Sequence, residues 1–174
     1  MNRGTIYYHF PTKESMRLEA QWGYFIDCKR VAEKYCQDER YVSIVAMALY
    51  NIKMQRDVKL ARFCRQSCVD YPVFTGKKDL TYFYCSAYEY MWSRFWDMEK
   101  ISPMAFATVY GYIMSCVRLL CEHPNQYEAL ELFLHCCQAS LSIWGAPNSL
   151  AQETNARIYI TALPDEAYTV QSCV

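Results

Sequence analysis

The stretch RGTIYYHFPTK, from Arg3 to Lys13, decides how the rest of the sequence is interpreted. Ile6 and Phe10 are four residues apart, so in a helix they lie on one face and form its buried pair. Pro11 ends that helix, because the residue before a proline is pushed out of the α region. The stretch is therefore predicted to be a short helix followed by a turn into a second helix.

The other faces of the short helix carry groups suited to contact with DNA phosphates and base edges. These groups are a cation, hydroxyls, aromatic rings and an imidazole, from Arg3, Thr5, Tyr7, Tyr8 and His9. Gly4 lets the backbone approach a bulky group such as a phosphate. Thr12 can cap the second helix, and Lys13 stands at its start, where a cation opposes the helix dipole. A nearby anion would explain a lysine in that position.

The run from Asn2 to Glu14 resembles, without a gap, the end of the DNA-binding domain of the tetracycline-repressor (TetR) family of bacterial transcriptional regulators. That motif ends in a small turn residue, a basic residue, Gly, Thr, an aliphatic residue, Tyr, an aromatic residue, His or Tyr, Phe, a short turn, Lys and an acidic residue. The resemblance implies a helix-turn-helix whose groove-facing residues are Arg3, Thr5, Tyr8 and His9, with Tyr7 and Lys13 on phosphates and Gly4 at the close approach. The alternative is that the aromatic residues are the core of an ordinary amphipathic helix.

The family has two further helices before this one, and they are absent from the sequence. An isolated helix of about eight residues is not stable in water. We therefore expect either that Met1 is an internal methionine of a protein that starts upstream, or that the chain is a natural truncation. For the sequence as given, we expect weak or absent operator binding.

Composition indicates one core, or a small head on one body, in 174 residues with a formal net charge of zero. A local positive charge remains at the start, where residues 1–17 carry three cations against one carboxylate. No apolar run follows Met1, so we expect a cytoplasmic protein whose ten cysteines are reduced thiols. The apolar stretch Met104 to Cys121 is interrupted by polar residues, and we interpret it as a buried or interface helix that does not enter a membrane.

Apolar periodicity and capping residues predict an all-α protein. The predicted helices are Thr12–Cys36, Tyr41–Gln55, Asp57–Val69, Asp79–Trp96, Ser102–Glu122, Asn125–Trp144 and Asn148–Ala162. Residues 1–36 would be the end of the helix-turn-helix plus a connector helix, and residues 37–174 a helical ligand-binding and dimerisation domain. The resemblance implies that the connector transmits ligand occupancy, and that residues 102–144 form a hairpin that meets its copy in a homodimer.

The aromatic stretch 79–96 is the best candidate for a ligand pocket. Tyr84, Tyr88 and Trp92 are spaced so that they share one helix face and could line a cavity for a small-molecule effector. Taken singly, each residue fits an ordinary core position better, and the pocket is implied mainly by the resemblance.

No motif supports an enzyme, a cofactor site or a metal site. His135 and Cys136 are neighbours on a helix and point about 100° apart, so they do not form a nucleophile and base pair. Cys64 and Cys68 share a face and leave open a soft-metal or oxidant-sensing role. The sequence thus predicts a ligand-responsive DNA-binding regulator of the repressor type. The alternatives are a ligand-binding and dimerisation module without independent DNA binding, or a thiol-based redox sensor.

Overall fold

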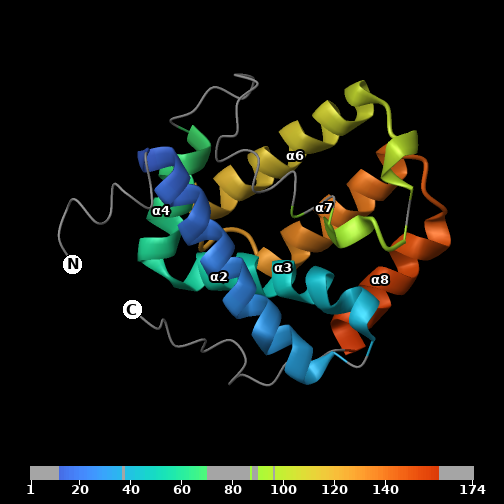
Figure 1. Cartoon of the computed structure of the whole chain (residues 1–174), viewed down its shortest axis with the longest axis horizontal. Coiled ribbons are helices and arrows are strands. Elements are labelled where there is room, and N and C mark those ends of the chain that lie inside the picture. Colours follow the sequence, from blue (N-terminus) through green and yellow to red (C-terminus); the bar gives the residue numbers. More distant parts are fainter. Residues whose placement is uncertain (1–11, 37, 70–86, 88–89, 96, 161–174) are drawn as a thin grey trace.

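The computed structural model describes residues 12–36, 38–69, 87, 90–95 and 97–160, and all regular structure in this part of the chain is helical (Figure 1). The all-α prediction is therefore confirmed. The elements are α2 (Lys13–Tyr35), α3 (Glu39–Arg56), α4 (Val58–Val69), the 3₁₀ turn η1 (Met98–Lys100), α6 (Pro103–Glu122), α7 (Ala129–Ile143) and α8 (Asn148–Ile160). The predicted DNA-contact residues Arg3, Gly4, Thr5, Tyr7, Tyr8 and His9 lie outside the described residues, as do Tyr84 and Tyr88.

Helix α3 is the centre of the body, and it contacts α2, α4, α6, α7 and α8. Every residue from Tyr41 to Met54 is buried, including Asn51 and Lys53. The Asn51 side chain donates to the Met47 carbonyl at 2.8 Å, which satisfies its amide inside the core. A helix that is covered on all sides is a core helix, so the other helices are arranged around α3 (Figure 1).

Three helix starts agree with the caps expected from the sequence. The Thr12 hydroxyl accepts from the Ser15 amide at 3.0 Å, and the Ser102 hydroxyl accepts from the Ala105 amide at 3.1 Å. Asp57 accepts from two amides of the first turn of α4. Helix α3 starts two residues earlier than expected, because Asp38 caps it by accepting from the Arg40 amide at 3.0 Å.

Helix α7 starts later than predicted, whereas α8 starts at the predicted residue. Asn125 was expected to cap α7, but the helix begins at Ala129, and Asn148 is the first residue of α8 instead of its cap. The α7 start is set by Gln55 at the end of α3. Its amide nitrogen donates to the carbonyls of Pro124 and Tyr127 at 2.7 and 2.6 Å, and its amide oxygen accepts from the Ala129 N–H at 3.1 Å.

The described part of the aromatic segment contributes mainly to the core. Ala87, Met91 and Trp92 are each 0% exposed, and Trp92 lies edge-on to Phe95 with ring centroids 6.2 Å apart. The α-helical geometry of this segment ends at Trp92, which is earlier than the expected end at Trp96.

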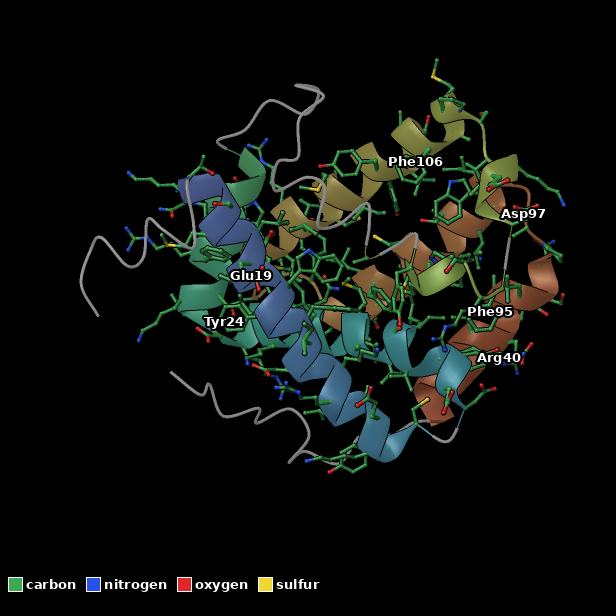
Figure 2. The ribbon with its side chains drawn as sticks, viewed as in Figure 1. Glu19, Tyr24, Arg40, Phe95, Asp97 and Phe106 are labelled. Atoms are coloured by element: carbon green, nitrogen blue, oxygen red, sulfur yellow. The ribbon has the colours of Figure 1, made fainter. Side chains whose placement is uncertain are left out.

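Helix α6 alone among the described helices has the length and hydropathy of a membrane span, a test that the core helix of a water-soluble domain also passes. One third of its apolar window is buried within the chain. Its N-terminal half packs on the end of α7, where Phe106 stacks with Trp144 at 6.4 Å between ring centroids (Figure 2).

Candidate functional site

The first described residues form the junction between the sequence motif and the body. Thr12 and Ser15 make a reciprocal capping box, because the Thr12 N–H also donates to the Ser15 hydroxyl at 3.2 Å. Lys13 is the first residue of α2 and is exposed. The capping box fixes where α2 begins, and it holds Lys13 at the N-terminal end of a helix of 23 residues.

Helix α2 lies across α3 with a narrow buried stripe (Figure 1). The stripe consists of Gln21, Phe25, Cys28 and Ala32, which recur at helical spacing. The spacing of apolar residues in the sequence predicts Ala20, Gly23 or Tyr24, and Tyr35 on this face, but Ala20, Gly23 and Tyr35 are exposed. The prediction was wrong there because a pattern of apolar residues gives no weight to Gln21, which is 0% exposed.

The seam between α2 and α3 contains polar groups that weaken its packing. Both side-chain polar atoms of Gln21 and the Lys53 ammonium are buried and have no hydrogen-bond partner within the described residues. The Lys53 ammonium lies 5.2 Å from the centroid of the Tyr24 ring on α2 (Figure 2). Unpaired polar atoms lower the free energy gained by burial, so α2 is held less firmly than an all-apolar helix would be.

A cleft of about 460 Å³ lies beside the second half of α2, which is within the size range of small-molecule sites. It is bounded by α2, the start of α3 and the segment 90–94. Its lining residues are Lys29, Glu33, Cys36, Glu39, Val42, Ser43, Tyr90 and Arg94. These residues give the cleft two cations, two carboxylates and two hydroxyls, so it suits a polar ligand.

Tyr90 is the point where two cations meet in this cleft. The Lys29 ammonium donates to the Tyr90 hydroxyl at 3.4 Å, and it lies 5.5 Å from the ring centroid. The Arg94 guanidinium lies 5.8 Å from the same centroid. The hydrogen bond from Lys29 lowers the pKa of Tyr90. Lys29 thus ties α2 directly to the segment that follows the aromatic stretch.

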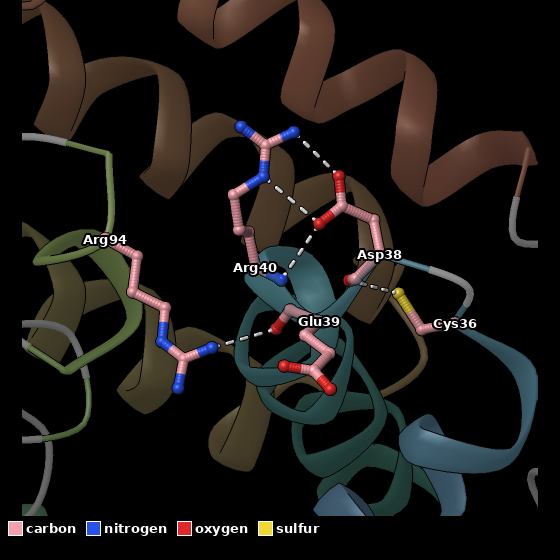
Figure 3. A network of polar contacts seen from close by, with 5 residues as sticks. All are labelled: Cys36, Asp38, Glu39, Arg40 and Arg94. Carbon is pink, nitrogen blue, oxygen red and sulfur yellow. Dashed lines mark hydrogen bonds and ion pairs between the residues drawn. The ribbon is translucent and has the colours of Figure 1, made fainter.

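Arg94 also reaches the start of α3, where it donates to the Glu39 carbonyl at 3.3 Å (Figure 3). Next to it, the Arg40 guanidinium makes two bonds to the Asp38 carboxylate at 3.1 and 2.8 Å, and the Cys36 thiol donates to the Asp38 carbonyl at 3.2 Å. The turn between α2 and α3 is therefore braced on both sides. Cys36, Glu39 and Arg94 of this network also line the cleft, so a ligand bound there would contact them.

Of the predicted pocket residues, only Trp92 is described, and it lines neither this cleft nor a second cavity of about 270 Å³ between α7 and α8. Sequence reasoning missed Lys29, Tyr90 and Arg94. The spacing of Tyr90 and Arg94 is visible in the sequence, but Lys29 lies on another helix, and no local pattern brings it there.

Within the described residues, no group of three or more metal-ligating side chains comes together. Comparisons with protein-family models, with curated proteins and with solved structures gave no match.

Proposed function

We propose that the protein is a ligand-responsive DNA-binding transcriptional regulator of the TetR type, acting as a repressor in the cytoplasm. One observation carries the proposal: the ungapped run from Asn2 to Glu14 leads directly into a capped helix of 23 residues with Lys13 exposed at its start. The resemblance implies a helix that begins at Lys13, and the observed start of α2 supports the proposal in this respect. The remaining helices then serve as the body on which the head is mounted.

The cleft beside α2 supports an effector-dependent mechanism. A rise of about 1.5 Å per residue puts Lys29 roughly 24 Å along the helix from Lys13. A polar ligand that takes over the contact between Lys29 and Tyr90 would release or tilt α2 at that end. In this proposal the DNA-binding head precedes the opposite end of α2, so the same tilt would move the head. Coupling of this kind typically amounts to about 1–3 kcal/mol.

The hairpin of α6 and α7 supports a homodimer. Met104 and Ile143, at the open end of the hairpin, are 77% and 42% exposed. Tyr112, farther along α6, is 40% exposed. Contact between two copies through this hairpin would remove these apolar side chains from water. Two heads are needed to reach half-sites about 34–36 Å apart, so a dimer through this hairpin would complete the regulator.

The alternative is a ligand-binding and dimerisation module that has no DNA binding of its own and disables a full-length subunit by pairing with it. Translating the gene in frame upstream of Met1 separates the two. Two apolar-periodic helices ending in a turn would support the regulator, and a nearby stop codon would support the module.

Replacing Lys13 with alanine, in protein made from the full open reading frame, should weaken binding to all DNA sequences alike. The physical reason is that phosphates carry no sequence information, and losing one phosphate contact should lower the salt slope of the binding constant by about 1. Fluorescence anisotropy over a series of salt concentrations measures both quantities. Lys59→Ala, in the first turn of α4, is the matched control and should leave them unchanged. A loss confined to some sequences would assign Lys13 to base reading instead.

A further inference from the structure

The cleft beside α2 contains charged side chains that are only loosely paired. The Lys29 ammonium lies 4.0 Å from a Glu33 carboxylate oxygen and 3.4 Å from the Tyr90 hydroxyl, whereas charge-assisted hydrogen bonds are usually about 2.7–2.9 Å long. Within the described ranges, neither the Arg94 guanidinium nor the Glu39 carboxylate takes part in an ion pair. Charged groups of a ligand can therefore replace the existing contacts of the cleft at little cost.

The turn next to the cleft pairs its charges tightly. The Arg40 guanidinium makes two hydrogen bonds to the Asp38 carboxylate, at 3.1 and 2.8 Å. Arg94, in contrast, makes one hydrogen bond within the described part of the chain, to the Glu39 backbone carbonyl at 3.3 Å. Figure 3 shows the Glu39 carboxylate on the side of Arg94, away from the pair of Arg40 and Asp38. The charges that line the cleft thus remain available to a ligand, whereas those of the turn do not.

The lining of the cleft favours a ligand with a group of each charge. The Lys29 ammonium and the Arg94 guanidinium lie 5.5 and 5.8 Å from the centroid of the same Tyr90 ring. Like charges gathered at one ring repel each other, and a carboxylate that contacts both would lower this repulsion. The guanidinium fork also matches the geometry of a carboxylate. Glu33 and Glu39 line the same cleft and favour a cation in the same way.

We infer that the cleft binds a small zwitterion of the α-amino acid class. Its carboxylate contacts Lys29 and Arg94. Its ammonium group contacts Glu33 and Glu39. An acid without the ammonium group would bring its negative charge to two carboxylates without compensation, and an amine without the carboxylate would meet two cations. The cleft volume of about 460 Å³ accommodates such a molecule, and Val42 supplies apolar surface for its side chain.

The inference rests on the proposed function in one respect, namely that the amino acid acts as the effector, whereas its binding is measured without DNA. Amino-acid binding that leaves the DNA affinity of the full open reading frame unchanged would support the ligand class and contradict an effector-controlled regulator. DNA binding by a protein that binds no amino acid would support a DNA-binding protein and overturn the inference.

Matched probes test the charge requirement. Isothermal titration calorimetry of the 174-residue chain with each of the common L-amino acids selects the one that binds best. The same side chain is then offered without the ammonium group, as the deaminated acid, and without the carboxylate, as the decarboxylated amine. We expect each truncated probe to bind about tenfold more weakly or worse, because it loses charge-assisted contacts. Equal affinity for the acid and the amino acid, or no binding of any amino acid at millimolar concentration, would overturn the inference.

Neutral variants assign the two ends of the ligand. Arg94→Gln should weaken binding of the amino acid and of the deaminated acid about tenfold and leave the amine unchanged. Glu39→Gln should weaken the amino acid and the amine and leave the acid unchanged. Arg30→Gln, on the exposed side of α2, and Glu131→Gln, on the exposed side of α7, are the matched controls and should change none of the three affinities. Circular dichroism shows that each variant is folded. Unchanged amino-acid affinity in both cleft variants, or equal losses in the controls, would place the ligand elsewhere and overturn the inference.

Discussion

Replacing Trp92 with alanine is expected to lower the free energy of unfolding by about 3–5 kcal/mol, the usual range for removing a large aromatic side chain from a core. Trp92 is 0% exposed and contacts Phe95, which in turn packs against Tyr41 with ring centroids 4.9 Å apart. The substitution would thus leave a cavity between the aromatic segment and α3. Urea unfolding followed by circular dichroism measures the loss.

Two further substitutions separate packing from ligand binding. Tyr90→Ala, two residues earlier and 39% exposed, should cost far less stability than Trp92→Ala. Trp92→Phe should recover most of the stability, since it restores an aromatic ring and removes an indole N–H that has no hydrogen-bond partner within the described residues. If Trp92→Ala left stability unchanged and altered only effector binding, Trp92 would be a pocket residue and its core role would be wrong.

Replacing Gln55 with methionine is expected to cost about 2–3 kcal/mol. Methionine keeps the volume of the side chain but makes none of the three hydrogen bonds that Gln55 makes to the turn between α6 and α7. Each polar group left without a partner costs about 1–3 kcal/mol when buried, and less here because the turn is partly exposed. Thermal and urea unfolding both report the change.

Gln66→Met, on the exposed face of α4, is the matched control and should change stability little. Hydrogen exchange gives a second, local readout: the amide of Ala129 should exchange faster in Gln55→Met, while amides in the middle of α3 keep their ranking. Unchanged exchange at Ala129 would mean that Gln55 does not set the start of α7.

Fold class and most helix starts could be predicted because caps act locally. Thr12, Asp57 and Ser102 each accept hydrogen bonds from amides two or three residues away, which a sequence pattern can contain. The start of α7 could not be predicted in this way. Its amide and carbonyl partners come from Gln55, more than 60 residues earlier, so only the packed structure reveals them.

The residues of the candidate site divide in the same way: local sequence is enough to place some of them, and only the packed structure brings the others together. Lys13 could be placed at the start of a helix from its neighbours alone, and the structure has it there. The cleft at Tyr90 joins separate parts of the chain, and the spacings of neighbouring residues do not contain it. The burial of Gln21 was missed for another reason: tertiary packing placed a polar residue on the contact face of α2.

The most direct test of the central claim is photo-cross-linking from Tyr8, in the short helix predicted at the start of the sequence. Protein made from the full open reading frame, with p-benzoylphenylalanine in place of Tyr8, would be bound to a duplex selected by the unmodified protein from random DNA and then irradiated. The same probe in place of Tyr35, exposed at the far end of α2, is the control. The account predicts a protein–DNA adduct from the probe at Tyr8 and none from the probe at Tyr35. Failure to select any duplex, or equal adduct yields from the two positions, would contradict it.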